Sequence, residues 1–527
     1  MVSSCGPIQR GSAQFDASAP EPLPRLNGTL FLHGGGIVSD EARERFSSLA
    51  GGKNARIVVI PTADTKDPLN EKKLNVWSPY PYARIDILHA SSREQALDPK
   101  LSEILEQATG VWLSGGKQTK LIDTYAGTPV ETRIHQLLDR GGIVGGTSAG
   151  SAVISKVMLV YSELRSGFDW LPGAIVDQHF LVRNRLARLE SAVSMYPEQV
   201  GFGIDEGTAL IVNGRNIEVL GESTVTVCLA ASSNRPARLE ILKTGMKADL
   251  IALRRAAVSR FAPPFPSAEP LQPAIKKGSL FIGGGGGISN QVMNRFFQLA
   301  GGEQSHIVYI PCSDELEIEK TPTMVQFFSD LGAGSVQWLH TKDRKLADDL
   351  DFLQPLAKAT GIWFGGGRQW NLVDSYQNTE AHRFMHKVLE RGGVIGGSSA
   401  GASIQGDYMP RGSPLGNREI MAEGYERGLG FLTGVAIDQH FTQRNRFKDM
   451  ALLKRTFPQL LGIGIDEKTA LVVQGQRAEI VGEGKVAFYD KWQGNHEIET
   501  FSSFEAGTIY DLVDRKKVVN EEKVKSE

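Results

Sequence analysis

Most of the sequence occurs twice, with the second copy about 250 residues after the first. The corresponding runs are Leu30–Gly36 with Leu280–Gly286, Gly110–Gln118 with Gly361–Gln369, and Asp177–Phe180 with Asp438–Phe441. The offset grows from 250 in the first pair (280 minus 30) to 261 in the last (438 minus 177), so the second copy carries about ten extra residues. One hydrophobic core seldom serves 527 residues, so the chain is expected to fold as two similar domains.

Composition marks the ends of the two copies. Residues 1–26 are small, polar and proline-containing, which predicts a flexible N-terminal tail. Residues 254–277 contain five prolines and are expected to form a stiff linker. The two domains are therefore predicted to span residues 27–253 and 278–527.

Short β-branched runs alternate with longer helical patterns in each copy. In the first copy the predicted strands are Arg56–Ile60, Gly110–Leu113 and Ile143–Gly145, and helical patterns cover Asn70 onward, Thr119–Tyr125 and Ser151 onward. This alternation predicts an α/β fold in which helices join the parallel strands of an open sheet. Functional groups are expected at the carboxyl edge of that sheet, where the glycine-rich turns lie.

Both copies contain the pattern Gly-x-Ser-x-Gly, at Gly146–Gly150 and at Gly397–Gly401. Apolar residues precede each pattern and indicate the end of a buried strand. When such a strand turns sharply into a helix, the serine hydroxyl stands exposed at the bend. The alternative is a glycine-rich turn in which the serine is only a helix N-cap.

Each copy also supplies one histidine and one glutamate at a fixed spacing. The histidine ends an Asp-Gln-His segment, and the glutamate follows it by 27 residues in both copies (206 minus 179, 467 minus 440). A hydroxyl nucleophile needs an imidazole to remove its proton and a carboxylate to orient that imidazole. The predicted catalytic residues are Ser148, His179 and Glu206 in the first copy, and Ser399, His440 and Glu467 in the second.

Other histidines are weaker candidates for the base. His89 matches His340 and His135 matches His386, both at an offset of 251 (340 minus 89, 386 minus 135). One pair lies among unlike neighbours and the other lies in helical patterns. These four residues, and His33, are therefore expected to be packing or surface residues.

Charge and cysteine usage exclude several classes of partner. A net charge of -2 argues against nucleic acid, because binding phosphate requires a basic excess. The three cysteines, Cys5, Cys228 and Cys312, are too few and too scattered for a disulfide framework or a thiolate metal site. No metal and no cofactor are predicted. No apolar run reaches the roughly 20 residues of a membrane span.

The N-terminal tail bears on localisation. It lacks the basic start and the apolar core of a signal peptide, and a cytoplasmic protein is expected. The alternative is an extracytoplasmic lipoprotein anchored through Cys5, with the polar tail as its tether.

The order of motifs identifies a family. Gly-Thr-Ser-Ala-Gly, then Asp-Gln-His-Phe-x-x-Arg-x-Arg, then Gly-Ile-Asp-Glu resembles the cyanophycinase branch of peptidase family S51, relatives of aspartyl dipeptidase. The resemblance covers nearly all of both copies and leaves out the tail and the linker. An amidotransferase of the same fold would have cysteine at the turn, and both copies have serine.

The resemblance implies a fold and an activity. Each domain would have the class I glutamine-amidotransferase-like, flavodoxin-like fold, with a mostly parallel sheet flanked by helices. The enzyme would be a serine exopeptidase-like hydrolase with a Ser-His-Glu triad. It would cleave cyanophycin, multi-L-arginyl-poly-L-aspartate, to β-Asp-Arg dipeptides.

Substrate chemistry suggests the binding residues. A β-aspartyl unit exposes a free α-carboxylate, which a guanidinium binds with two parallel hydrogen bonds. Arg183, Arg185 and Arg188 follow the first histidine and could place several guanidinium groups near one pocket. Without the neighbouring histidine, a solvated basic helix start would be the favoured interpretation of such a run. The resemblance implies that Gln118, Asp177 and Gln178 also line the pocket. The counterparts in the second copy are Gln369, Asp438, Gln439, Arg444 and Arg446.

The oxyanion of the reaction needs preorganised N–H donors. In the first copy these are expected to be the backbone N–H of Ala149 and that of Gly115 or Gly116. The second copy would use Ala400 and Gly366 or Gly367.

The copies differ at one binding position. Where the first copy has Arg188, the second has Asp449, which would repel an anionic substrate unless the adjacent Lys448 compensates. The extra residues lie within 406–430 and offer other basic groups, Arg411, Arg418 and Arg427. The second copy is therefore expected to prefer a different polymer position or another dipeptide.

Two other functions and one assembly remain open from sequence. The alternatives are an isoaspartyl or aspartyl dipeptidase of the same family, and a partly degenerate binding or scaffold protein with one active copy. A tandem fusion holds both halves of a dimer interface at high effective concentration. The two copies are expected to pack as an intrachain pseudo-dimer, which would leave a monomer in solution.

Overall fold

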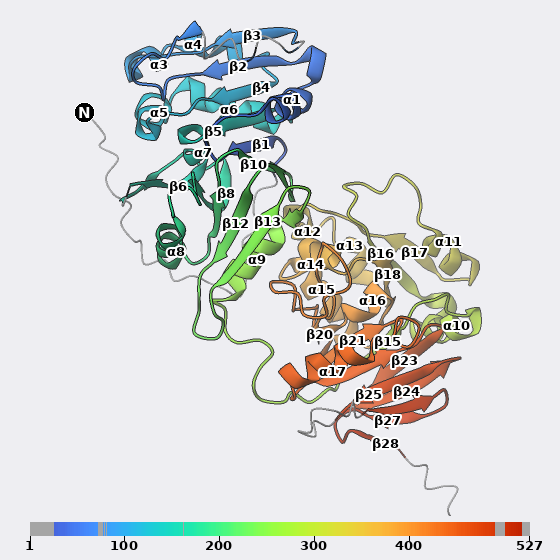
Figure 1. Cartoon of the computed structure of the whole chain (residues 1–527). Coiled ribbons are helices and arrows are strands. Elements are labelled where there is room, and N and C mark those ends of the chain that lie inside the picture. The colour runs from blue at the N-terminus through green and yellow to red at the C-terminus, as the bar shows by residue number, and fades with distance from the viewer. Residues whose placement is uncertain are drawn as a thin grey trace, which may run out of the picture. The chain divides into compact units, whose positions relative to one another are not determined.

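The structure is a computed structural model that describes residues 26–71, 77, 80, 82–161, 163–490 and 501–518. Cys5 and all of the predicted tail except its last residue lie outside the described residues. The chain divides into two compact units, Met1–Pro263 and Pro264–Glu527. Figure 1 labels their helices and strands. Helix α9 (Leu250–Ser259) occupies the first residues of the segment predicted as a linker.

The first unit contains two sheets. The larger has eight strands in the order β14-β11-β10-β1-β5-β4-β2-β3, of which β1, β5, β4, β2 and β3 run parallel. Its strands are β1 (Thr29–His33), β2 (Arg56–Ile60), β3 (Arg84–Ile87), β4 (Gly110–Leu113), β5 (Ile143–Thr147), β10 (Thr208–Asn213), β11 (Asn216–Gly221) and β14 (Lys247–Asp249). The predicted parallel strands are thus present, with an antiparallel extension on one edge.

The second sheet of this unit was not predicted. It has six strands in the order β13-β12-β9-β8-β6-β7, with β6, β8 and β9 parallel. Its strands are β6 (Ser155–Val160), β7 (Glu163–Ser166), β8 (Leu171–Gln178), β9 (Val200–Ile204), β12 (Thr224–Leu229) and β13 (Arg238–Lys243). The remaining helices are α1 (Asp40–Leu49), α3 (Arg93–Ala96), α4 (Pro99–Ser102), α5 (Gln118–Tyr125), α6 (Pro129–Asp139), α7 (Ala149–Ala152) and α8 (Leu186–Met195).

One predicted helix is much shorter than expected. The helical pattern from Ser151 onward yields only α7, which ends at Ala152. The next residues include Val153, Ile154 and Val157, whose branched side chains favour extended backbone, and strand β6 follows at once. The helix predicted from Asn70 onward falls largely outside the described residues.

The second unit repeats this plan. Its larger sheet has nine strands in the order β17-β16-β18-β19-β15-β23-β24-β27-β28, and its smaller sheet has five in the order β20-β21-β22-β25-β26. The larger sheet comprises β15 (Ser279–Gly283), β16 (His306–Cys312), β17 (Ser335–Trp338), β18 (Gly361–Gly367), β19 (Val394–Ser398), β23 (Thr469–Gln474), β24 (Arg477–Gly482), β27 (Ile509–Asp511) and β28 (Lys516–Lys517). The smaller sheet comprises β20 (Gly406–Tyr408), β21 (Leu432–Gln439), β22 (Leu461–Ile465), β25 (Lys485–Tyr489) and β26 (Ser502–Glu505).

Most helices of the second unit have a counterpart in the first. The helices of the second unit are α10 (Asn290–Leu299), α11 (Thr323–Asp330), α12 (Arg344–Ala347), α13 (Gln354–Lys358), α14 (Trp370–Tyr376), α15 (Glu380–Glu390), α16 (Ala400–Ser403) and α17 (Phe447–Thr456). Helix α10 corresponds to α1, and α12–α17 correspond to α3–α8. Within the residues that the structure describes, none of the helices combines the length and apolar character that crossing a membrane requires.

Strand β1 shows how the first core is built. Leu30 and Leu32 pack with residues of the smaller sheet, such as Val176, while Phe31 packs on the opposite face with Trp112. Successive side chains of a strand point to opposite faces, so β1 is buried on both sides. The central strands are therefore fixed by packing, and the segments that leave their carboxyl ends start from rigid positions.

Candidate active site

The two turns share an unusual backbone conformation at the serine. Ser148 has φ 53° and ψ −110°, and Ser399 has φ 58° and ψ −113°. Non-glycine residues seldom adopt such angles, and they are typical of functional sites. Neither serine side chain caps its helix, so the N-cap alternative does not describe these turns.

Close packing explains the glycines that flank the first serine. A Cβ at Gly146 would lie 2.5 Å from the backbone of Gly150, and one at Gly150 would lie 2.2 Å from the carbonyl oxygen of Leu113. Real Cβ atoms do not approach backbone atoms so closely, so only glycine fits on either side. The sharp turn thus depends on both glycines, as the sequence pattern predicts.

The structure brings together the predicted serine, histidine and glutamate of each copy. Ser148 Oγ lies 2.7 Å from His179 Nε2, and His179 Nδ1 lies 2.5 Å from Glu206 Oε1. In the second copy, Ser399 Oγ lies 2.9 Å from His440 Nε2, and His440 Nδ1 lies 2.6 Å from Glu467 Oε1.

The three side chains leave neighbouring strand ends. Ser148 follows β5, His179 follows β8, and Glu206 comes two residues after β9. Strands β8 and β9 are paired in parallel, so their carboxyl ends lie side by side. Ser148 thus comes from the larger sheet and the other two residues from the smaller one, and they meet where the carboxyl ends of β5, β8 and β9 lie together.

Two glycine-rich loops hold the histidines in place. These loops were not predicted to be part of the site. The N–H of His179 donates to the carbonyl oxygen of Gly34 at 2.7 Å, and that of His440 to Gly284 at 2.9 Å. A Cβ at Gly35 would lie 2.2 Å from the His179 ring, and one at Gly285 would lie 2.3 Å from the His440 ring. The signal was present in the sequence, since both loops belong to the repeated run after the first strand.

Replacing Gly35 with alanine is expected to lower activity at the first site roughly 100-fold, because a displacement of about 1 Å at a catalytic group costs that much. The new methyl group must displace the imidazole that it would otherwise overlap. The substitution is made with Ser399→Ala, so that only the first site is measured, and kcat is compared with that of Ser399→Ala alone.

Gly141→Ala is the matched control for this substitution. Gly141 also has positive φ (89°), but a Cβ there meets no atom within 4 Å. Backbone strain is therefore similar in the two variants, and only Gly35→Ala disturbs the histidine. Equal activities of the two variants would show that the loop does not position the imidazole.

An aspartate beside each glutamate links two parts of the site. Asp205 Oδ1 accepts the backbone N–H groups of Leu181 and Val182 at 2.9 and 3.1 Å, and Oδ2 accepts the Ser223 hydroxyl at 2.8 Å. This buried carboxylate ties the loop after His179 to the strand end that carries the glutamate. Asp205 belongs to the Gly-Ile-Asp-Glu motif, but no role was predicted for it.

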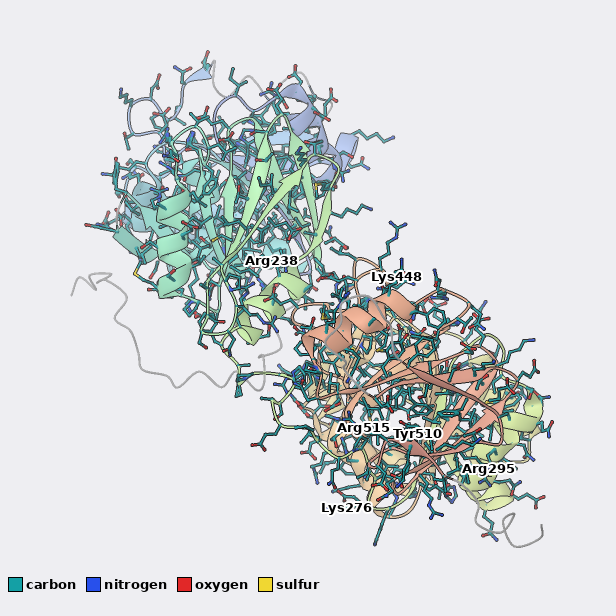
Figure 2. The ribbon with its side chains drawn as sticks, turned by 60° about the horizontal axis from the view of Figure 1, so that its bottom comes forward. Arg238, Lys276, Arg295, Lys448, Tyr510 and Arg515 are labelled. Atoms are coloured by element: carbon teal, nitrogen blue, oxygen red, sulfur yellow. The ribbon has the colours of Figure 1, made fainter. Side chains whose placement is uncertain are left out.

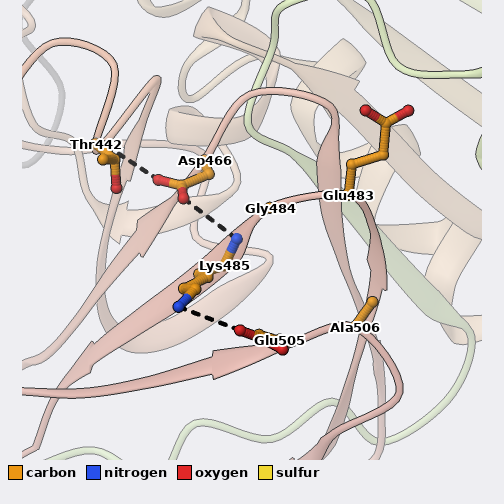
Figure 3. A pocket seen from close by; sticks show the side chains of 7 residues that line it. All are labelled: Thr442, Asp466, Glu483, Gly484, Lys485, Glu505 and Ala506. Carbon is orange, nitrogen blue, oxygen red and sulfur yellow. Dashed lines mark hydrogen bonds and ion pairs between the residues drawn. The ribbon is translucent and has the colours of Figure 1, made fainter.

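The second copy uses the corresponding aspartate in the same way. Asp466 accepts the backbone N–H of Thr442 at 3.0 Å and that of Lys485 at 3.2 Å. Figure 3 shows this carboxylate in a pocket of about 510 Å³, with the Lys485 ammonium directed toward Glu505. Its bonds to Thr442 and Lys485 link the loop after His440 to strand β25.

Burial sets the protonation of the imidazoles. It lowers the pKa of both His179 and His440, and the hydrogen bond to the adjacent glutamate partly opposes that shift. Each imidazole is therefore neutral at pH 7 and can accept a proton from the serine. Burial also lowers the pKa of His33 to about 4, and its Nδ1 accepts the Gly35 N–H at 3.2 Å.

One glycine of each predicted oxyanion pair lies beside the serine. A Cβ at Gly115 would lie 3.5 Å from that of Ser148, and one at Gly366 would lie 3.6 Å from that of Ser399. Gly116 and Gly367 face other backbone: a Cβ there would lie 2.2 Å from the carbonyl oxygen of Ala63 and 2.5 Å from that of Cys312. Ala149 and Ala400 are the first residues of α7 and α16, where N–H groups have no partner within the helix.

The predicted binding residues of the first copy gather around Asp177. This aspartate is fully buried and pairs with Arg188, whose Nε donates at 2.9 Å, and with Arg185 at 3.2 Å. Arg185 also donates to the Gln178 side chain at 2.7 Å, and Gln178 donates to Gln118 at 3.3 Å.

Arg183 lies apart from this cluster. Its side chain is exposed, and its charge contributes to lowering the pKa of His179, which places it near the imidazole. The structure thus joins five of the six predicted binding residues in one network and leaves the sixth at the surface beside the histidine.

In the second copy the network is built from different positions. Asp438 pairs with Arg446 and also with Arg411, which comes from the extra residues. Gln439 accepts from Arg446 at 3.0 Å, whereas Gln369 donates to the carbonyl oxygens of Pro410 at 2.7 Å and Arg411 at 2.9 Å. Arg444 is exposed, as its counterpart is.

Of the basic residues considered near Asp449, Arg411 pairs with it and Lys448 does not. Asp449 pairs with Arg411 at 2.7 Å, and Lys448 is exposed on α17 (Figure 2). Side chains three and four residues apart on a helix are neighbours, but adjacent ones diverge. A lysine next to the aspartate in sequence therefore points elsewhere.

Comparison with known proteins finds the same family in both copies. The model of peptidase family S51 matches residues 30–220 and 280–481. A cyanophycinase of Geminocystis herdmanii is 34% identical over 220 residues, which cover 38% of this chain and 80% of that protein. A cyanophycinase of Nostoc sp. is 34% identical over 224 residues, 39% of this chain and 74% of that protein.

Solved structures give a further comparison. A crystal structure described as a peptidase from an acI-B1 Actinobacterium is 25% identical to this chain, with a TM-score of 0.35. It covers 43% of this chain and 98% of the compared chain. Like the two cyanophycinases, it matches a length close to that of one copy.

Proposed function

The chain belongs to peptidase family S51 as a tandem duplication and is a hydrolase of the serine peptidase type. We propose that it cleaves cyanophycin to β-Asp-Arg dipeptides with a Ser-His-Glu triad in each copy. The observation that carries the proposal is the hydrogen-bonded chain of serine, histidine and glutamate in each copy. The similarity to cyanophycinases supports the choice of substrate.

The proposed reaction begins at the serine. Ser148 Oγ attacks the carbonyl carbon of the scissile amide while His179 Nε2 takes the hydroxyl proton. Glu206 accepts the Nδ1–H, which holds the ring in the tautomer that leaves Nε2 free to act as the base. The imidazolium then gives its proton to the leaving amine, and water hydrolyses the acyl-enzyme by the same route in reverse.

Charge that develops on the carbonyl oxygen requires donors beside the serine. We assign this role to the backbone N–H groups of Ala149 and Gly115, since Gly115 lies next to the serine and Gly116 faces the Ala63 carbonyl. Such donors are fixed before the reaction, so they stabilise the oxyanion without reorganising. Ala400 and Gly366 are assigned the same role in the second copy.

The substrate carboxylate is assigned to the exposed arginine next to each histidine. Arg183 and Arg444 are exposed there, whereas Arg185 and Arg188 already pair with Asp177. A guanidinium that is not engaged by a buried carboxylate can bind the free α-carboxylate of a β-aspartyl unit. The buried pairs are then expected to shape the pocket wall rather than to bind this group directly.

Incubation of the full chain with cyanophycin, followed by mass analysis of the products, tests the proposed function. Release of β-Asp-Arg dipeptides is the expected result. An isoaspartyl dipeptidase would leave the polymer intact and hydrolyse free β-aspartyl dipeptides instead. A binding or scaffold protein would leave both substrates intact, and either of these outcomes would refute cyanophycin cleavage.

A further inference from the structure

The extra residues of the second copy form a segment with fixed contacts. This inserted segment, residues 409–429, connects β20 to β21 and runs beside α14 and α15 (Figure 1). Hydrogen bonds from the two residues that flank α14 hold the segment at both ends: Gln369 donates to the carbonyl oxygens of Pro410 and Arg411, and Gln377 donates to those of Arg427 and Gly428 at 3.0 and 3.1 Å. The Tyr425 hydroxyl donates to Asp374 at 2.8 Å, and His382 Nε2 lies 2.8 Å from the carbonyl oxygen of Leu429. Contacts at both ends of the segment fix it against the domain and make it part of the domain wall.

Arg411 joins this segment to the binding residues. Its Nε lies 3.1 Å from both carboxylate oxygens of Asp438, and its Nη2 donates to Asp449 at 2.7 Å. Its Nη1 donates to the carbonyl oxygen of Asn417 at 2.9 Å, within the segment itself. One buried guanidinium thus holds β21, α17 and the inserted segment together.

The same buried aspartate is paired from different chain positions in the two copies. In the first copy the second arginine comes from α8, as Arg188, and Val160 ends β6. In the second copy the α17 residue is Asp449, and Arg411 stands where Val160 does, at an offset of 251 (411 minus 160). The second arginine therefore comes from the helix in the first copy and from the segment after β20 in the second, where the helix carries a carboxylate that pairs with it.

This exchange changes the exposure of the arginines but not that of the catalytic groups. The Arg188 and Arg185 side chains are 21% and 15% exposed, whereas those of Arg411 and Arg446 are each 3% exposed. The histidines, at 10% and 9%, and the glutamates, at 33% and 32%, are equally open in both copies. The inserted segment therefore covers the arginine side of the second site and leaves the nucleophile side open.

We infer that the inserted segment, clamped by Arg411, closes the arginine side of the second site and restricts it to short β-aspartyl peptides, while the first site accepts the polymer. This inference rests on the proposed function and assigns different substrate lengths to the two copies. Long substrates need an open path past the reacting bond, and a fixed wall removes that path on one side.

Two single-site variants compare the sites directly. Ser399→Ala leaves the first site and Ser148→Ala leaves the second, and kcat/KM is measured for long cyanophycin and for a synthetic peptide of two β-Asp-Arg units. The ratio of long to short substrate is expected to be at least about tenfold lower for the second site. Equal ratios would overturn the inference, whereas absence of dipeptide release by both variants from both substrates would instead refute the proposed function.

The clamp is tested within Ser148→Ala. Arg411→Val with Asp449→Arg gives the second copy the residues of the first at these two positions, with valine at position 411 and arginine on the helix. It is expected to raise the ratio of long to short substrate about tenfold, because the inserted segment loses its anchor. Asp449→Arg alone is expected to lower activity on both substrates, since it adds a third guanidinium group to the two beside Asp438 and removes the carboxylate that pairs with Arg411.

Arg418→Val is the matched control, since Arg418 is an exposed arginine of the same segment. It is expected to leave the ratio unchanged. Thermal unfolding of each variant establishes that the fold is retained. A folded Arg411→Val, Asp449→Arg variant with an unchanged ratio would contradict the role of Arg411, and a variant that does not fold leaves the comparison of the two single-site variants as the deciding result.

Discussion

Replacing both Ser148 and Ser399 with alanine is expected to abolish cyanophycin hydrolysis, with a loss on the order of 10⁶-fold in kcat, as is typical when a serine nucleophile is removed. Each serine has its own imidazole within hydrogen-bond distance and each imidazole its own carboxylate. No other hydroxyl occupies either position. Release of β-Asp-Arg, followed by mass analysis over time, measures the effect.

The single variants are expected to keep part of the activity. Ser399→Ala leaves the first triad intact and is expected to retain most of the hydrolysis of long cyanophycin. Ser148→Ala leaves the second triad intact and is expected to retain activity mainly on short β-aspartyl peptides. Within one site, serine and histidine substitutions should be non-additive, because the two groups act as one unit. Unchanged hydrolysis by the double serine variant would rule out the serine mechanism.

Replacing Glu206 with glutamine is expected to lower kcat of the first site by roughly 10⁴-fold, the loss that follows when the carboxylate of a triad becomes an amide. The carboxylate accepts from His179 Nδ1 at 2.5 Å and fixes the tautomer with Nε2 directed at the serine. An amide can present its N–H groups instead, which favours the wrong tautomer. The variant is measured with Ser399→Ala, under conditions that saturate the site.

Glu222→Gln serves as the matched control for that variant. Glu222 is an exposed carboxylate of the same unit, located after β11, and its neutralisation is expected to leave kcat unchanged. Glu467→Gln with Ser148→Ala repeats the test in the second site. If Glu206→Gln retained full activity, another group would have to orient the imidazole.

The triads could be predicted from the sequence because their residues lie at strand ends. Ser148, His179 and Glu206 each follow an apolar run at a strand end. Parallel pairing of β8 with β9 brings His179 and Glu206 together, and Ser148 joins them from β5 of the other sheet. The repeat added weight, since the same order of motifs recurs in the second copy. The order of the motifs and the apolar runs before them were sufficient to predict which serine, histidine and glutamate come together.

The arginine networks could not be predicted in the same way. Arg411 was one of three basic residues in the extra segment, and only the path of that segment decides which one reaches Asp438. Lys448 was the nearer residue in sequence, but its direction on α17 takes it into solvent. Pairing of side chains depends on the three-dimensional course of an irregular segment, for which the sequence has no periodic signal.

The close approach of a glycine backbone to a catalytic side chain could not be predicted from the sequence either. Gly35 could have been an ordinary turn residue, and its contact with the His179 ring follows from how two separate strand ends meet. The short helix α7 is a similar case, since the β-branched residues after Ala152 override the helical pattern. Tertiary packing decides both features.

Labelling with a fluorophosphonate, followed by peptide mass analysis, tests most directly the claim that the chain holds two serine nucleophiles. The result expected is two labels per chain, one on Ser148 and one on Ser399, with Ser148→Ala and Ser399→Ala each reducing the count to one. Labelling of neither serine, or of a serine outside the two strained turns, would contradict the account.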